Sequence, residues 1–438
     1  MRRISLGVPC MAAAVLLVFG VTLAARGDEA ERKRVLALGQ TTGDDSLNGE
    51  LQTLLANPGQ TKKLLAEGLT LLNDKEQALK YNTAHLLAQA AAELKDLKAS
   101  EAFYRLCMGQ AVKLQSTRKI LQSYGGLIDT LYENKKYAES AKVCKELLEL
   151  KTGDGKPRVY YLAVPNRFGE PDFIEDEDFD PAKRLRPGVH RLLIQAIAKQ
   201  GKFDQAIKLA DNLIRAQDTW QERQLKAWVQ REAGRFGEAA RTYEDVLERI
   251  EKDATLEPEE KEQYQERYRY ILSNVYVDLK QIDRAAEKLK ALIAKKAEEP
   301  AYYNDLGYIW ADHDMNLGEA EKLIRKALDL DRAKRRKANP KLTPDEDKDN
   351  GAYLDSLGWV LFKQKKYKEA KEALLEAVKD KTAQHIEIYD HLGDVHMALG
   401  ERDAAIAAWR RGLEVAGEGQ REKQRRTEVE KKLQQQMK

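Results

Sequence analysis

The stretch that decides the fold is LDSLGWVLFKQKKYKEAKEALLEA, residues 354–377. Apolar residues recur at helical spacing around Gly358, and Tyr367, Ala370 and Leu374 follow 9, 12 and 16 residues later. A polar KQKK segment, residues 363–366, separates these two amphipathic halves. The pattern predicts two helices that pack against each other where each carries a small residue.

The same pattern recurs along the chain. Its small or apolar centres are Ile194, Ala227, Ser273, Gly307, Gly358 and Gly393, separated by 33, 46, 34, 51 and 35 residues. Three gaps lie near a period of 34, and the two long ones exceed it by 12 and 17. This predicts an array of about six helix pairs over residues 187–416, with insertions near 251–262 and 331–350. The second insertion is expected to form an exposed loop.

This pattern resembles the tetratricopeptide repeat (TPR), a pair of antiparallel helices. The resemblance implies an all-α fold, a right-handed α-solenoid of TPR helix-turn-helix repeats. It is strong over 187–416 and weaker over 83–150. The sequence departs from the family at Arg402, where an aromatic residue is usual, and most units lack the closing proline.

Elementary packing supports the same fold. Gly307, Gly358 and Gly393 are predicted to lie within helices, where glycine costs about 1 kcal/mol relative to alanine. That cost is offset if the missing side chain lets a second helix approach closely. No single pair buries its apolar face alone, so the helices must stack.

The remaining segments flank or interrupt the array. They are a signal peptide or N-terminal anchor (1–25), an N-terminal helical cap (26–82), divergent TPR-like repeats (83–150), a Pro-, Gly- and acid-rich insertion (151–186) and a charged C-terminal capping helix (417–438). We expect 151–186 to be a solvated loop rather than a calcium site, because it lacks the EF-hand spacing of glycine and glutamate.

The N-terminus predicts export. Basic Arg2 and Arg3 precede an uncharged run from Met11 to Ala25, which is short for a membrane helix of about 20 residues. The small-x-small triplet ending at Ala24 suits a signal peptidase. We therefore expect a periplasmic or secreted protein; an uncleaved segment that holds it at the membrane is the alternative.

Composition excludes a dedicated nucleic-acid binder. Lys and Arg number 75 against 72 Asp and Glu, and the two signs are interleaved. Cys107 and Cys144 lie in apolar helical patterns, where they fit buried thiols or a disulfide.

No motif nominates a catalytic residue or a cofactor. The chain lacks a phosphate-binding loop, HExxH, GxSxG and the dinucleotide fingerprint. His385, His391 and His396 crowd one predicted helix among acids, so a metal-binding protein or metal-dependent enzyme is an alternative. Without a third convergent ligand, we predict no metal and no enzyme.

The resemblance implies that the first helix of each pair lines a concave groove. Residues three before, one after and four after each centre share one helical face. We name the following nine the first-helix row: Tyr270, Asn274, Asn304, Tyr308, Asp355, Trp359, Phe362, Asp390 and Asp394. Aromatic rings beside carboxylates suit a protein or peptide with a basic or apolar anchor. The two tryptophans at this spacing, Trp228 and Trp359, also fit a packed core.

These patterns predict an exported, non-catalytic scaffold of the bacterial cell envelope. The protein would bind a peptide or protein segment in its groove as part of an envelope complex. A self-assembling structural protein is the other alternative, and peripheral membrane association and homo-oligomers stay open.

Overall fold

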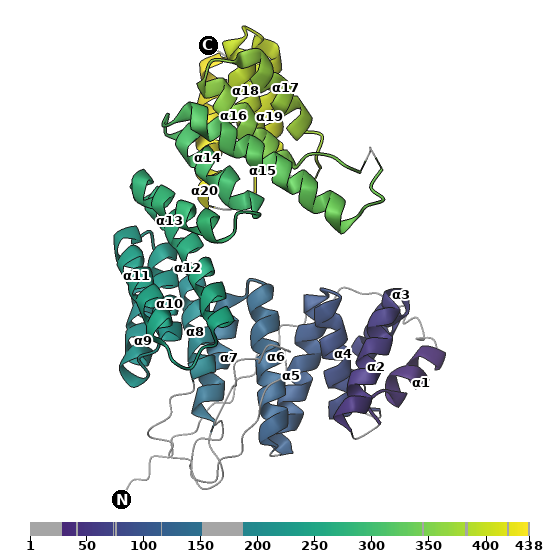
Figure 1. Cartoon of the computed structure of the whole chain (residues 1–438). Coiled ribbons are helices and arrows are strands. Elements are labelled where there is room, and N and C mark those ends of the chain that lie inside the picture. The colour runs from purple at the N-terminus through teal and green to yellow at the C-terminus, as the bar shows by residue number, and fades with distance from the viewer. Residues whose placement is uncertain are drawn as a thin grey trace, which may run out of the picture. The chain divides into compact units, whose positions relative to one another are not determined.

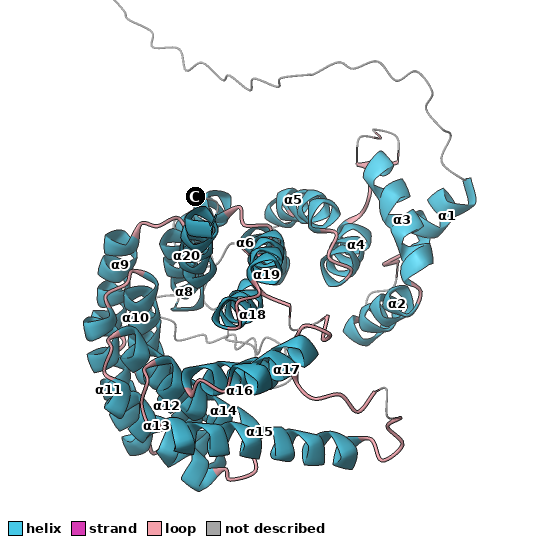
Figure 2. Ribbon diagram, turned by 90° about the horizontal axis from the view of Figure 1, so that it is seen from above, coloured by secondary structure: helices cyan, strands magenta, loops and turns pink. Residues whose placement is uncertain are grey.

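The structure is a computed structural model that describes residues 29–40, 43–72, 74, 77–114, 116–150, 187–343, 346–381, 384–417 and 420–436. Within these ranges the chain forms twenty α-helices and no strand (Figure 2). The predicted signal segment 1–25 and the acidic insertion 151–186 lie outside the described residues, so the expectations for them stay predictions.

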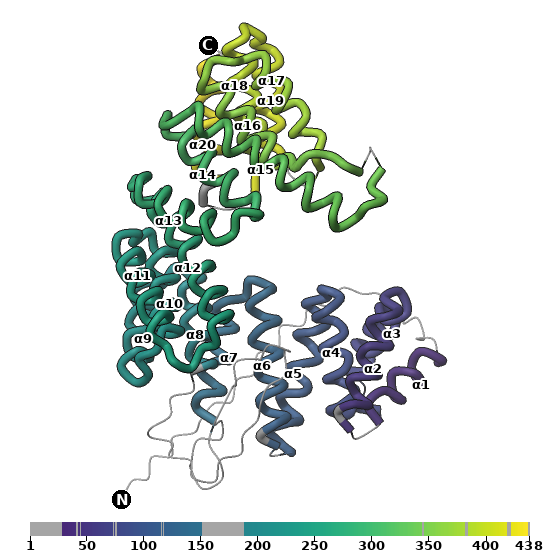
Figure 3. Tube along the Cα trace, in the orientation of Figure 1, coloured from purple at the N-terminus to yellow at the C-terminus, as the bar shows by residue number. Residues whose placement is uncertain are grey.

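The chain divides into two compact units, residues 1–196 and residues 197–438. The first unit contains α1 (Glu29–Ala37), α2 (Asp44–Ala56), α3 (Pro58–Leu71), α4 (Tyr81–Glu93), α5 (Leu97–Lys113), α6 (Thr117–Glu133) and α7 (Tyr137–Glu149). Helices α4 to α7 pack each against the next, as Figure 3 traces. Residues 81–149 thus form four helices that pack in succession.

The core of the first unit is closely packed. A Cβ on Gly126 of α6 would collide with the ring of Tyr104 on α5, so glycine is required where these helices cross. Cys107 and Cys144 are both buried and both free thiols. The disulfide alternative is therefore not formed, and the two cysteines pack as small apolar residues.

The remaining helices are α8 (Pro187–Lys199), which contains the boundary between the units, α9 (Phe203–Ala216), α10 (Trp220–Glu232), α11 (Phe236–Lys252), α12 (Pro258–Asp278), α13 (Ile282–Lys295), α14 (Pro300–Asp312), α15 (Leu317–Ala338), α16 (Gly351–Lys363), α17 (Tyr367–Ala377), α18 (Ile386–Ala398), α19 (Arg402–Val415) and α20 (Gln420–Gln436). In the second unit, each even-numbered helix from α10 to α18 packs against the helix that follows it (Figure 1). The predicted helix pairs, and the all-α solenoid that they build, are confirmed.

The second helices begin where the nine-residue offset predicts. Their first residues are Phe203, Phe236, Ile282, Tyr367 and Arg402. Helix α15 starts one residue late, at Leu317, because Asn316 adopts a left-handed conformation just before it. The turn position that is left-handed in the other pairs is a glycine in some, such as Gly234, where there is no steric penalty, and a lysine in others, such as Lys280 and Lys365.

The mid-helix glycines lie where two helices touch, as predicted. A Cβ on Gly358 of α16 would lie 2.5 Å from Cγ of Leu374 on α17. On Gly307 of α14 it would lie 2.6 Å from Cγ1 of Ile324 on α15. Both partners are fully buried. The absent side chain therefore allows the close helix contact.

The expectation of a loop over 331–350 is only half right. Its basic first part continues α15 to Ala338. Cations are favourable in the last turns of a helix because they face the negative end of its dipole. Arg332 also bonds both oxygens of Asp349, and Arg336 contacts Asp347, which fixes the acidic part along the helix. The basic residues thus form the end of a helix, and the acidic residues that follow lie back along it.

Helix α20 covers the last helix pair, packing against α18 and α19. Val429 and Leu433 are its two buried apolar residues, and they join Trp409, Ile386 and Ala405 in one cluster. The rest of α20 is almost entirely polar. Within the described ranges no helix is both long and apolar enough to span a membrane.

Candidate interaction site on the first helices

The first-helix row lies on α12, α14, α16 and α18 of the second unit. Five members keep partial exposure: Tyr270, Asn274, Tyr308, Phe362 and Asp394. The other four are buried: Asn304, Asp355, Trp359 and Asp390. A partner could therefore contact only some of the predicted side chains directly, and the others shape the surface from beneath.

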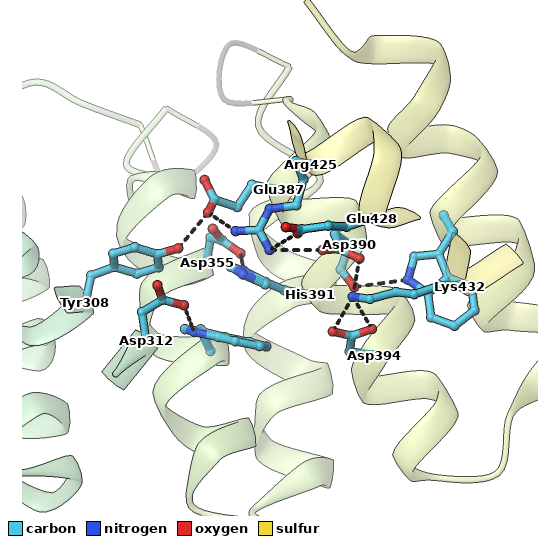
Figure 4. A network of polar contacts seen from close by, with 12 residues as sticks. Tyr308, Asp312, Asp355, Glu387, Asp390, His391, Asp394, Arg425, Glu428 and Lys432 are labelled. Carbon is cyan, nitrogen blue, oxygen red and sulfur yellow. Dashed lines mark hydrogen bonds and ion pairs between the residues drawn. The ribbon is translucent and has the colours of Figure 1, made fainter. Parts of the chain in front are cut away.

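Helix α18 presents three carboxylates, Glu387, Asp390 and Asp394, which we call the α18 acidic face (Figure 4). Arg425 of α20 donates to Glu387 over 2.8 Å and to Asp390 over 3.2 Å. Lys432, two turns further along α20, donates to Asp390 over 2.6 Å and to both oxygens of Asp394 over 2.7 Å. Each cation thus bridges two neighbouring carboxylates.

Burial makes these ion pairs structurally important. The Asp390 side chain is fully buried, while those of Arg425 and Lys432 keep 24% and 30% of their exposure. A buried carboxylate without a cation is strongly unfavourable, so both contacts to Asp390 stabilise the docked helix. Burial raises the pKa of Asp394, and the charge of Asp390 adds to this rise against the opposing effect of Lys432.

Glu387 connects the acidic face to α14. The hydroxyl of Tyr308 donates to it over 2.6 Å. Burial alone would raise the pKa of Glu387, but the charge of His391, the Tyr308 hydrogen bond and the charge of Arg425 outweigh burial and lower it. The carboxylate therefore stays ionised and ready to hold a cation.

Beneath this surface lies a buried aromatic and charged layer. His391 of α18 is fully buried, and its Nδ1 lies 2.8 Å from Oδ1 of Asp355 on α16. Burial alone would lower the pKa of His391, but the charge and hydrogen bond of Asp355 raise it. The imidazole stacks on Trp359, with ring centroids 4.1 Å apart. Trp359 in turn donates to Asp312 over 3.2 Å.

Aromatic residues continue the row away from α18. Phe362 stacks on Trp359 with centroids 5.1 Å apart. On α12, Tyr270 donates to Asp305 over 2.6 Å, and its carbonyl accepts from the Asn274 side chain over 3.0 Å. Partly exposed aromatic rings that rest on a fixed buried layer offer contact area with little loss of side-chain entropy.

The three histidines do not converge. His391 pairs with Asp355, whereas Nδ1 of His396 lies 2.5 Å from Glu401 at the start of the next helix. Over the part of the chain that the structure describes, no group of three His, Cys, Asp or Glu side chains is placed to hold a metal ion.

Sequence reasoning missed the residues that occupy the acidic face. It predicted a capping helix at 417–438 but assigned no contact to Arg425 or Lys432, and it left Glu387 outside the row. One signal was available: Val429 and Leu433 are four residues apart, and Arg425 and Lys432 fall on the same helical face.

Comparisons with known proteins identify tetratricopeptide repeats within residues 191–418. Residues 191–254 and 272–335 match one tetratricopeptide repeat family model, residues 351–382 match a second and residues 386–418 match a third. A TPR repeat-containing protein of Pseudomonas aeruginosa is 32% identical over 126 residues. That alignment spans 29% of this chain and only 18% of the relative.

Similar solved structures include a tetratricopeptide repeat protein from Parabacteroides merdae and a thermophilic TPR protein from Thermus thermophilus. The first is 11% identical, with a TM-score of 0.48, 74% of this chain covered and 100% of the other. The second is 17% identical, with a TM-score of 0.35, 50% of this chain covered and 99% of the other. The four segments that match the family models fall on the helix pairs of residues 187–416, and these pairs are therefore tetratricopeptide repeats.

Proposed function

We propose that this protein is an exported, non-catalytic scaffold that binds a peptide or protein segment along its first-helix row within an envelope complex. Tetratricopeptide repeats in general mediate protein interactions, so the chain is an interaction scaffold in the broad sense. The carrying observation is the α18 acidic face, which already holds two cations of another helix, Arg425 and Lys432 of α20.

The chemistry of the row supports a ligand with a basic or apolar anchor. Glu387, Asp390 and Asp394 accept from cations, and the other first helices offer partly exposed rings, Phe362 on α16 and Tyr270 on α12. Basic side chains pair with carboxylates, and apolar side chains pack on rings, so one segment can satisfy both.

Export rests on the sequence of residues 1–25. A direct test expresses the full chain and locates it by cell fractionation, followed by sequencing of the mature N-terminus. We expect the protein in the periplasm or the medium, starting just after Ala24. An intact N-terminus in the membrane fraction would contradict cleavage and would support an uncleaved N-terminal anchor instead.

Binding along the row is tested with the chain from residue 26 on, immobilised and exposed to an envelope extract of its source. The variant N274E/F362E places charge on two partly exposed row positions. The matched control L375E places charge on α17, where the leucine is 40% exposed. We expect a discrete partner to bind the parent and L375E and to be lost from N274E/F362E. Equal capture by all three proteins would contradict the proposed site.

A further inference from the structure

Helix α20 meets the α18 acidic face through four residues on one helical side. They follow the spacing Arg425, Val429, Lys432, Leu433, which is i, i+4, i+7 and i+8. The two apolar members enter the cluster around Trp409, and the two cations bridge the carboxylates. The contact is therefore a helix docked by a short and defined pattern.

The acidic face requires such an occupant. In the described part of the chain, both cations that bond Glu387, Asp390 and Asp394 come from α20. If α20 left without replacement, the buried Asp390 would lose both cations, which is unfavourable. The helix can therefore leave readily only if another basic helix takes its place.

The apolar part of the contact is small. Among residues 422–436 of α20, Val429 and Leu433 are the two that are buried, whereas Lys423, Glu430 and Lys431 are exposed. Recognition thus depends mainly on where the cations fall, and any helix with the same spacing presents the same groups.

We infer that the α18 acidic face is a receptor for a basic amphipathic helix of a partner protein, with the spacing cation-x3-apolar-x2-cation-apolar, and that α20 is its resident occupant. This inference rests on the proposed function and specifies its ligand. Because α20 is tethered beside the site, its effective concentration is high, so the partner helix must compete with it. A partner helix therefore displaces α20 only if it binds the α18 acidic face more favourably than the tethered α20 does.

The test uses a fluorescent 17-residue peptide with the sequence of residues 420–436 and the chain from residue 26 on. The variant R425A/K432A removes the two cations from the resident helix. The matched control K423A/K431A removes two exposed cations from the same helix and the same net charge. Circular dichroism and tryptophan fluorescence verify that both variants are folded.

We expect the peptide to bind R425A/K432A at least tenfold more tightly than it binds the parent or K423A/K431A. A peptide with glutamate in place of its Arg425 and Lys432 counterparts should not bind, and rising salt should weaken binding of the parent peptide. Adding Asp394→Asn to R425A/K432A should lower the affinity again, because one of the carboxylates that holds Lys432 is neutralised.

Three results would overturn the inference. Equal and weak binding to all folded variants would make α20 a structural cap. Binding of the glutamate peptide would exclude charge recognition. A concentration-dependent dimer of the parent that R425A/K432A abolishes would make a second copy of the chain the occupant. Partner capture that depends on Phe362 and Asn274 would still support the proposed function in each case, so the two can fail separately.

Discussion

The contact between Gly358 and Leu374 yields the sharpest prediction on stability. In Gly358→Ala, the new Cβ would lie 2.5 Å from Cγ and 2.9 Å from Cδ2 of Leu374, a side chain with no exposed surface. Overpacking a close-packed site costs about 1–3 kcal/mol. Alanine returns about 1 kcal/mol through its higher helix propensity. We expect a net loss of about 1 kcal/mol in the free energy of unfolding.

Urea unfolding followed by tryptophan fluorescence measures this loss in the second unit, which contains Gly358. All five tryptophans of the chain lie between residues 220 and 409, so the signal reports the second unit alone. The double variant G358A/L374A isolates the clash, because Leu374→Ala removes the atoms that Cβ would meet. In that background Gly358→Ala should be neutral or stabilising.

Gly237→Ala is the matched control for Gly358→Ala. It also lies in a helix of the second unit, but its added Cβ would have nothing within 4 Å. We expect it to be neutral or stabilising. If Gly358→Ala stabilises the protein as Gly237→Ala does, the packing argument for the mid-helix glycines is wrong.

Three further predictions concern titration and thiol reactivity. Burial lowers the pKa of His85 to about 4, so the unfolded state binds a proton before the folded state does as the pH falls below 6.5. At pH 4, His85→Phe should therefore recover up to about 3 kcal/mol of stability. Hydrogen exchange of the α4 amides would measure this gain. Because the pKa of His391 is raised in the folded state, its contribution to stability is complete below pH 6.5 and is lost as the pH rises through the folded pKa. Asp355→Asn removes the partner that raises this pKa. The free energy of unfolding, followed by tryptophan fluorescence, should then fall less as the pH rises. Burial raises the pKa of Cys144 to about 12 and raises that of Cys107 further. Neither thiol should therefore be alkylated at pH 8 until urea unfolds the chain, which peptide mass spectrometry would show. Rapid labelling of the folded protein would contradict their burial.

The fold was predictable because its signal is local and repeated. A small centre followed nine residues later by the start of a second helix located the first residues of α9, α11, α13, α17 and α19. The extension of α15 was missed because its basic run carries no apolar period, and its stability comes from ion pairs such as Arg332 with Asp349.

The site was harder to predict than the fold. Helical spacing placed Asp355 and Asp390 on the row, but it could not show that Asp355 is buried against His391 or that Asp390 is covered by α20. Those contacts join residues 35 to 42 positions apart, and the contacts to Asp390 depend on how α20 docks. Four spaced residues in a highly charged helix are a weak signal without that geometry.

The most direct test of the central claim is site-specific photo-crosslinking in the source organism. A benzophenone amino acid replaces Phe362 or Asn274 in the first-helix row, or the exposed Leu375 on α17 as the control. We predict one discrete adduct with an envelope protein from both row positions and none from position 375. Adducts from position 375 alone would contradict the claim that the first helices form the interaction surface.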